Sequence, residues 1–121
     1  MQKTILVVED FEDSRIFIKY LLESLGYKVL EAEDGFKAVE IVQRQIPDLI
    51  LMDMALPLIN GLTATKIIKQ FGKTSKVPII AMTASGQFIY QQAIEAGCKG
   101  LINKPLDINE LQPMIEQYLS E

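Results

Sequence analysis

Histidine is absent from the 121 residues of the chain, and cysteine occurs once, at Cys98. Without a histidine, the chain cannot contain a Ser-His-Asp or a Cys-His catalytic arrangement. A single cysteine cannot form an internal disulfide, which agrees with a reducing compartment. We interpret Cys98 as a small buried apolar side chain rather than a catalytic thiol.

Long apolar runs and a surplus of positive charge are also lacking. No apolar run approaches the length of a membrane span, and residues 1–3 lead directly into a predicted strand rather than a signal peptide. We therefore expect a cytoplasmic protein with no membrane association. The formal net charge of −4 disfavours a nucleic-acid partner, because such binding requires a basic surface. A sparse basic cluster, Lys66, Lys69, Lys73 and Lys76, is interpreted as a solvated helix face.

The apolar residues that the chain does contain suffice for one core. Hydrophobic residues make up 49% of the sequence and charged residues 23%, which predicts one globular domain over residues 1–121. Short apolar segments alternate with helical patterns five times, and the short connections predict right-handed βαβ units. We expect an α/β fold, a doubly wound parallel sheet of five strands with five helices. The expected strands cover residues 4–8, 28–30, 49–52, 77–82 and 101–103.

Apolar residues at helical spacing indicate the helices between these strands. One helix is expected to bury Ile46 and to end at Pro47. A later helix covers roughly residues 87–96. The last helix begins at Asp107, and Glu110 three residues on predicts a capping box, in which the two residues exchange hydrogen bonds.

Charged and hydroxyl side chains follow four of the predicted strands. Glu9 and Asp10 come after the first strand, Asp53 after the third, Thr83 after the fourth and Lys104 after the fifth. In an open parallel sheet, ligands bind beyond the carboxyl ends of the strands. We therefore expect these residues to line one rim of the sheet.

Three carboxylates at one rim require a cation, because two of them about 4 Å apart repel by roughly 1 to 4 kcal/mol. With only oxygen ligands at hand, a hard divalent ion fits, and Mg²⁺ is the ion we expect. Once the charge is balanced, Asp53 can act as a nucleophile toward a phosphoryl group, while Lys104 neutralises charge. The Thr83 hydroxyl and the backbone N–H of Ala84 can then hydrogen-bond the phosphoryl oxygens.

Four segments carry a family resemblance that covers essentially the whole chain: ILVVED (5–10), LILMDMALPLING (49–61), PIIAMTAS (78–85) and INKP (102–105). With the spacing of Asp53, Pro57 and Gly61, followed by Thr83 and Lys104, they resemble the response-regulator receiver domains of the CheY-like type. The resemblance implies that Asp53 is the phosphorylated aspartate, Thr83 the switch hydroxyl and Lys104 the phosphoryl-binding lysine.

The same resemblance implies a ligand set for Mg²⁺. Asp10 and Asp53 match direct ligands, Glu9 matches an acid that acts through metal-bound water, and Ala55 matches a ligand through its backbone carbonyl. It also implies a cis peptide bond between Lys104 and Pro105. The sequence departs from the family at Leu101, where a tyrosine or phenylalanine often takes part in the switch.

Such a domain is expected to be a phosphorylation-dependent switch of a two-component phosphorelay. Because the chain has no histidine, its phosphoryl group must come from the phosphohistidine of a partner, a histidine kinase or a histidine phosphotransfer protein. We expect no enzymatic activity beyond self-catalysed phosphorylation and slow hydrolysis.

Two other functions compete with this interpretation. A receiver-shaped binding module could work without phosphate, but the intact acidic triad, Thr83 and Lys104 argue against it. A flavodoxin-type electron carrier would need a Gly- and hydroxyl-rich phosphate loop after the first strand. The loop here is EDFEDS, which repels a phosphate that lacks a metal.

An uncharged segment, GQFIYQQ (86–92), indicates where a signal leaves the domain. Phe88, Ile89 and Tyr90 are consecutive, so a helix cannot turn all three toward the core. Leu101 lies on the adjoining strand, and the last helix adds Met114 and Tyr118. We expect the face formed by residues 87–96, 101–103 and the last helix to bind a downstream protein or to form a homodimer.

Overall fold

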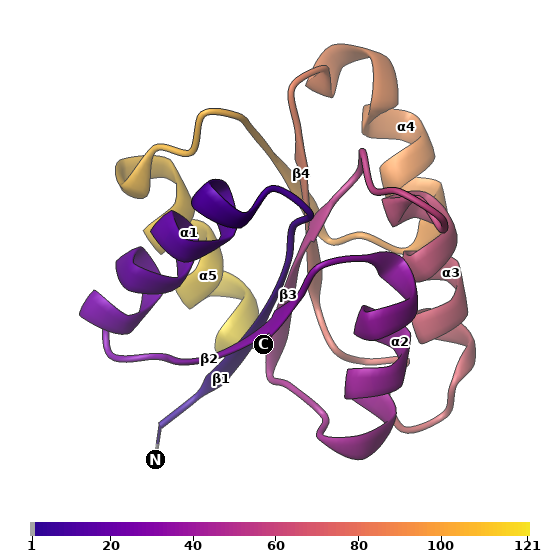
Figure 1. Ribbon diagram of the computed structural model, residues 1–121, viewed down its shortest axis with the longest axis horizontal. Coiled ribbons are helices and arrows are strands. Elements are labelled where there is room, and N and C mark those ends of the chain that lie inside the picture. The colour runs from indigo at the N-terminus through magenta and orange to yellow at the C-terminus, as the bar shows by residue number, and fades with distance from the viewer. Residues whose placement is uncertain (1) are drawn as a thin grey trace.

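The computed structural model describes residues 2–121, and Met1 lies outside the described residues. Five strands form one sheet in the order β2-β1-β3-β4-β5, with every neighbouring pair parallel. This arrangement confirms the predicted fold class (Figure 1). The strands are β1 (Thr4–Val8), β2 (Lys28–Ala32), β3 (Leu49–Asp53), β4 (Ile79–Thr83) and β5 (Gly100–Asn103). The helices are α1 (Glu12–Ser24), α2 (Gly35–Arg44), α3 (Gly61–Gln70), α4 (Gly86–Ala96) and α5 (Ile108–Leu119).

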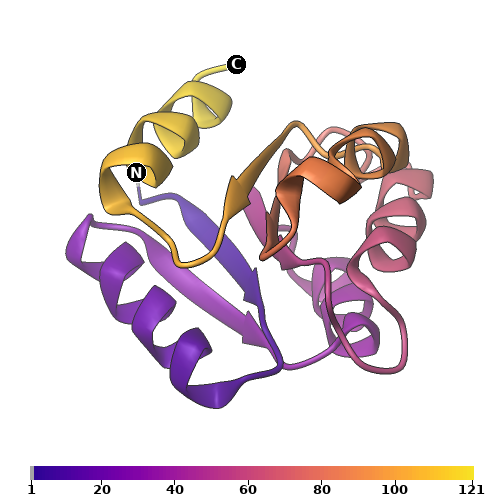
Figure 2. The same cartoon turned by 90° about the horizontal axis from the view of Figure 1, so that it is seen from above.

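Helices cover both faces of the sheet, which explains why the central strands β1, β3 and β4 are mainly apolar. In Figure 2, α1 and α5 lie on one side of the sheet and α2, α3 and α4 on the other. Alternate residues of β3 face the two layers: Ile50 and Met52 pack toward one apolar cluster, Leu49 and Leu51 toward the other. Full burial of such a side chain contributes about 1.5–3 kcal/mol. Packing between the two helical layers therefore fixes the positions of the ends of the central strands.

Two of the residues selected from the sequence are the last residues of their strands rather than residues that follow them. Asp53 pairs with Met82 across β3 and β4, and Thr83 pairs with Asn103 across β4 and β5. Strands β3 and β4 thus each extend one residue further at their carboxyl ends than predicted. The backbone of each residue is consequently fixed by strand pairing, at the edge where the sheet ends.

Two local predictions about helix ends were wrong. Asp107 caps α5 by accepting from the N–H of Asn109, and no bond from Glu110 completes a capping box within residues 2–121. Ile46 lies beyond the end of α2 and is 45% exposed. A residue that precedes proline is disfavoured in the helical conformation, so Pro47 ends the helix before Ile46 can join its buried face.

The predicted basic cluster is not a plain solvated face. The ammonium of Lys69 donates to the backbone carbonyls of Ser75 and Val77, and burial lowers the pKa of Lys69. Lys69 borders a cavity of about 550 Å³ at the amino ends of the strands. Four other lysines line the same cavity: Lys3, Lys73, Lys76 and Lys99. This cavity lies at the opposite end of the sheet from Asp53.

None of the helices formed by residues 2–121 has both the length and the apolar character that crossing a bilayer requires.

Gly61 begins α3 directly against the end of β3, and its missing side chain permits this approach. A Cβ at position 61 would lie 2.2 Å from the backbone oxygen of Asp53 and 2.8 Å from the Cα of Met54. Because both neighbours are backbone atoms, they cannot move aside without displacing the strand end that carries Asp53.

We expect Gly61→Ala to destabilise the protein by about 1–3 kcal/mol, the usual cost of overpacking. The matched control is Gly72→Ala, because a Cβ at position 72 meets nothing within 4 Å. Urea denaturation of the two variants should place the control within about 0.5 kcal/mol of the wild type. Equal stability of the two variants would contradict the close packing at α3.

Candidate functional site

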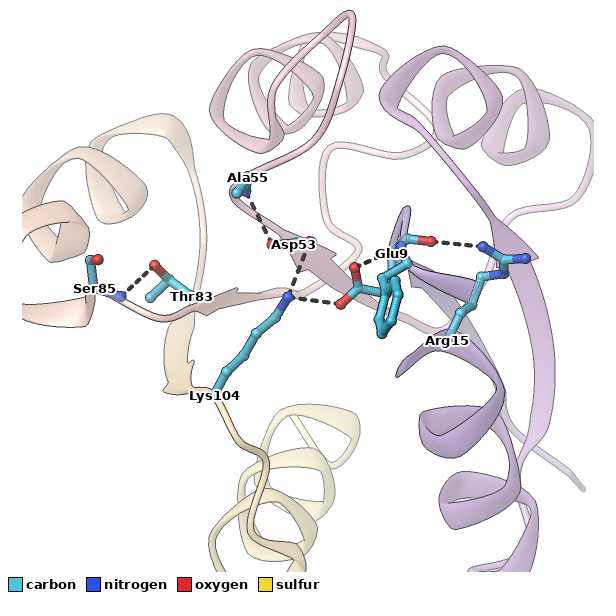
Figure 3. A network of polar contacts seen from close by, with 8 residues as sticks. Glu9, Arg15, Asp53, Ala55, Thr83, Ser85 and Lys104 are labelled. Carbon is cyan, nitrogen blue, oxygen red and sulfur yellow. Dashed lines mark hydrogen bonds and ion pairs between the residues drawn. The ribbon is translucent and has the colours of Figure 1, made fainter. Parts of the chain in front are cut away.

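The carboxyl ends of β1, β3 and β5 bring acidic and basic side chains together at one rim (Figure 3). Glu9 follows β1 and is buried, Asp53 ends β3 and is buried, and Asp10 is exposed. One carboxylate oxygen from each of the three lies within 4.8 Å of the others. The predicted acidic triad is therefore a real cluster in space.

Lys104 reaches into this cluster from the loop after β5. Its Nζ lies 2.7 Å from Oε1 of Glu9 and 3.1 Å from Oδ2 of Asp53. The Lys104–Pro105 peptide bond is cis, as the resemblance implied. One ammonium thus bridges two buried carboxylates that are 44 residues apart in the sequence.

Burial and charge pairing oppose one another at this bridge. Burial raises the pKa of Glu9, and the hydrogen bond from Lys104 only partly offsets it. Burial also lowers the pKa of Lys104, but its hydrogen bonds to Glu9 and Asp53 outweigh burial, so the net pKa is raised. Lys104 therefore stays charged at neutral pH, and the stabilisation of Glu9 as a carboxylate depends on it.

Both oxygens of Asp53 are engaged. Oδ1 accepts from the backbone N–H of Ala55 at 3.1 Å, while Oδ2 faces Lys104. The residue two positions beyond Asp53 therefore touches the candidate acceptor through its backbone. Its carbonyl, which the resemblance implied as a metal ligand, belongs to the same short loop after β3.

Arg15 is a residue of the site that sequence reasoning missed. Its guanidinium donates to the backbone oxygen of Glu9 at 3.0 Å and pairs with Glu31 of β2 at 3.2 Å. It therefore fixes the backbone that carries Glu9 and Asp10 from the side of α1. No short-range pattern indicated this role, because the partner is a carbonyl group and the contact depends on how α1 packs against β2.

The hydroxyl of Thr83 does not reach the acidic cluster in this structure. It accepts from the backbone N–H of Ser85 at 3.0 Å, and no hydrogen bond to Asp53 or Lys104 is found within residues 2–121. Ala84 is exposed in the loop that follows. The structure therefore brings Glu9, Asp10, Asp53 and Lys104 together, with the backbone of Ala55 against Asp53. Thr83, at the end of β4, and Ala84, in the loop that follows, lie outside these contacts.

The donor set of the cluster suits a hard divalent cation. All three side chains offer carboxylate oxygens, and neither histidine nor the buried Cys98 takes part. Mg²⁺ prefers such ligands and commonly keeps several waters, which the exposed position of Asp10 permits. The residues present therefore fit a magnesium ion.

Comparison with known proteins agrees with this geometry. The sequence model described as the response regulator receiver domain matches residues 5–116. The polar-differentiation response regulator DivK of Brucella anthropi is 33% identical over 122 residues, which covers 100% of this chain and 99% of that protein. Histidine kinase P4 of Formosa agariphila is 36% identical over 119 residues, covering 98% of this chain and 9% of that protein.

A solved structure resembles the whole fold. The receiver domain of the sensor histidine kinase PA1611 of Pseudomonas aeruginosa superposes with a TM-score of 0.93 and 36% identity, and the match covers 100% of both chains. That structure has a magnesium ion coordinated in its active-site cleft.

The buried carboxyl of Glu9 makes stability depend on pH. Because burial raises the pKa of Glu9 in the folded protein, the fold binds this proton more tightly than the unfolded chain does. The resulting stabilisation is fully present below the ordinary value of 4.5 and is lost as the pH rises through the raised pKa. Glu9→Gln should therefore raise the free energy of unfolding at pH 7, and this gain should shrink as the pH falls toward 4.5.

Urea denaturation across this pH range, in buffer containing a chelator, measures the effect. Glu33→Gln, which alters an exposed carboxylate between β2 and α2, serves as the control and should leave the pH profile unchanged. A Glu9→Gln protein that is less stable than the wild type at pH 7 would show that the bond to Lys104 outweighs burial.

Proposed function

The chain belongs to the response regulator receiver domain family, and from this membership we propose that Asp53 is the residue that accepts the phosphoryl group. As a receiver domain of two-component systems, the chain is a phosphorylation-dependent switch. The observation that carries the assignment of Asp53 is its position at the end of β3, where Lys104 lies 3.1 Å from one carboxylate oxygen. The other buried carboxylate of residues 2–121, Glu9, also contacts Lys104 and a backbone N–H, that of Phe11, but it lies beyond the end of β1, whereas Asp53 is a paired residue of β3.

The transfer step follows from this arrangement. An oxygen of the Asp53 carboxylate attacks the phosphorus of a phosphohistidine, an O–P bond forms, and the N–P bond of the donor breaks. The imidazole nitrogen leaves with the electron pair and takes up a proton. Lys104 holds positive charge beside the accepting oxygens, so charge moved onto the phosphoryl group is neutralised where it develops.

We propose that Glu9, Asp10, Asp53 and the carbonyl of Ala55 hold Mg²⁺ at this site. When bound, the ion neutralises the carboxylates and the phosphoryl oxygens. Asp10 is exposed and can ligate it directly, whereas buried Glu9, occupied by Lys104, is expected to act through water. Arg15 holds the backbone of Glu9, which fixes the position of both acids.

Thr83 and Ala84 complete the proposed site after transfer. In this structure the Thr83 hydroxyl accepts from the backbone N–H of Ser85. If the hydroxyl turned toward Asp53, it could donate to a phosphoryl oxygen, and the N–H of Ala84 would be a second donor. Leu101 is partly buried beneath this loop, so the change would be a shift in aliphatic packing.

The phosphoryl donor is expected to be a histidine kinase or a histidine phosphotransfer protein, in the cytoplasm. The domain would catalyse only its own phosphorylation and dephosphorylation. The alternative, a receiver-like module that binds partners without phosphate, gains no support from the site. Lys104 contacts Glu9 and Asp53, and Asp10 offers a carboxylate oxygen within 4.8 Å of theirs.

Incubation with acetyl phosphate and Mg²⁺ should add one phosphoryl group to the wild type and none to Asp53→Asn. Mass spectrometry of the intact protein, followed by peptide mapping, measures this. Asp10→Asn should slow the reaction about tenfold or more, because an amide is a poorer ligand for a hard cation. The control, Asp13→Asn, alters an exposed carboxylate in the first turn of α1 and should react like the wild type. Retention of the label by Asp53→Asn would contradict the assignment.

We also propose that the face formed by α4, β5 and α5 binds the downstream protein or a second copy of the chain. Phe88 is 78% exposed and Tyr90 54% exposed on α4, and Leu101 of β5 is partly buried. These apolar side chains lie on elements that adjoin the loop of Thr83, so a movement of that loop would alter their positions.

Amide chemical shifts should reveal this connection. Adding beryllium trifluoride and Mg²⁺ as a phosphoryl mimic should shift the amides of residues 86–92 and of Leu101, whereas those near the middle of α2 should stay unchanged. Shifts confined to the surroundings of Asp53 would contradict a role for this face.

A further inference from the structure

The first turn of α4 is capped from another strand. Ser85 occupies the N-cap position but makes no side-chain capping bond. Instead, Oδ1 of Asn103, at the end of β5, accepts from the backbone N–H of Gly86 at 3.2 Å. Helix N-termini require such acceptors, and they usually come from the local sequence. The start of α4 is therefore attached to β5 by a side chain 17 residues away.

The attachment has no space for a side chain at Gly86. A Cβ at position 86 would lie 2.3 Å from Oδ1 of Asn103 and 2.9 Å from Cδ2 of Leu101. Both atoms belong to side chains, so an alanine at this position would displace the Asn103 amide and a Leu101 methyl group. The absent local cap, the bond to Asn103 and the tight fit at Gly86 are three observations of the same contact.

Residues at the end of β5 thus contact both the candidate acceptor site and the start of α4. Successive strand residues point in opposite directions. Asn103 contacts Gly86 of α4, while Lys104 contacts Glu9 and Asp53. The backbone N–H of Lys104 also donates to the carbonyl of Thr83 at 2.8 Å.

The loop between β4 and α4 is fixed at three successive points. Its beginning is held by the bond from Lys104 to Thr83, its middle by the bond from Ser85 to the Thr83 hydroxyl, and its end by the bond from Gly86 to Asn103. In this arrangement the Thr83 hydroxyl is turned to Ser85. A movement of the loop relative to β5 that brings the hydroxyl and the Ala84 N–H to a phosphoryl group would stretch the bond at its end.

We propose that Asn103 is a positioning residue that holds the β4–α4 loop in its unphosphorylated arrangement. This inference rests on the proposed function of Asp53 and Thr83. The bond between Asn103 and Gly86 stabilises the arrangement in which Thr83 does not contact Asp53, so it opposes the phosphorylated one. A phosphoryl group shifts the equilibrium only through its differential affinity for the two arrangements. Removing the bond should therefore make the phosphoryl group, or a mimic of it, bind more tightly.

The first experiment tests the contact without using phosphate. Hydrogen exchange of the Gly86 amide, followed by NMR, should be faster in Asn103→Ala than in the wild type. Asn109→Ala is the matched control, because Asn109 is also an exposed asparagine, at the start of α5, where only its backbone N–H bonds to Asp107. Unchanged exchange at Gly86 in Asn103→Ala would overturn the contact.

The second experiment tests the coupling by titrating each protein with beryllium trifluoride in the presence of Mg²⁺. Asn103→Ala should bind the mimic about fivefold more tightly, which corresponds to ~1 kcal/mol, a typical net hydrogen bond. Gly86→Ala should change the affinity in the same direction, because its Cβ displaces Asn103. The double variant should show less than the sum of the two effects, since both remove one contact. A merely structural role for Asn103 would weaken the binding or leave it unchanged.

The outcomes separate this inference from the proposed function. If the wild type binds the mimic and Asn103→Ala binds it no more tightly, the inference is overturned and the role of Asp53 stands. If the wild type takes up neither the mimic nor a phosphoryl group from acetyl phosphate, the proposed function fails, and the role of Asn103 fails with it.

Discussion

One ammonium group between two buried carboxylates is the contact on which the site depends. Glu9 and Asp53 would repel each other at the rim of the sheet, and Lys104 lies within 3.1 Å of both. This contact requires β1, β3, β4 and β5 to be neighbours in that order, because Glu9 and Lys104 are 95 residues apart in the sequence. The two apolar layers on either side of β3 therefore do more than stabilise the fold. They hold three strand ends in the positions at which their charges balance.

The fold and the central residues of the site could be predicted from the sequence, because both depend on which residue types occur at which positions. A strand that is apolar at every position is typical of burial on two faces, and a carboxylate at its end, as at Asp53, is then placed at the rim. Arg15 and Asn103 could not be selected in this way. Their partners are a backbone carbonyl at Glu9 and a backbone N–H at Gly86, which belong to other elements. Such contacts depend on how closely two elements pack, and a sequence pattern does not specify that distance.

The different exposures of Glu9 and Asp10 divide their contributions to the charge of the site. Glu9 is buried against Lys104, so its charge is balanced inside the protein and its pKa is raised by burial. Asp10 is exposed and has no ion pair within residues 2–121. In the proposed metal site, a cation that approaches from solvent would meet Asp10 first, and Arg15 fixes the backbone of the preceding residue. The two neighbouring acids are chemically similar, but the fold buries Glu9 against Lys104 and leaves Asp10 exposed to solvent.

The position of Leu101 determines what kind of switch this fold can contain. Its side chain lies beneath the start of α4 and packs against the cluster on that side of the sheet, close to Gly86. An aliphatic side chain has no hydroxyl to hydrogen-bond in a second position, so it cannot report a loop movement by changing partners. The polar contact that we propose to distinguish two loop positions lies instead two residues further on, at Asn103, whose side chain accepts a hydrogen bond from the first residue of α4. A switch built in this way would transmit a shift of the loop through the first turn of a helix. The exposed side chains Phe88 and Tyr90 on that helix would then carry it to the surface.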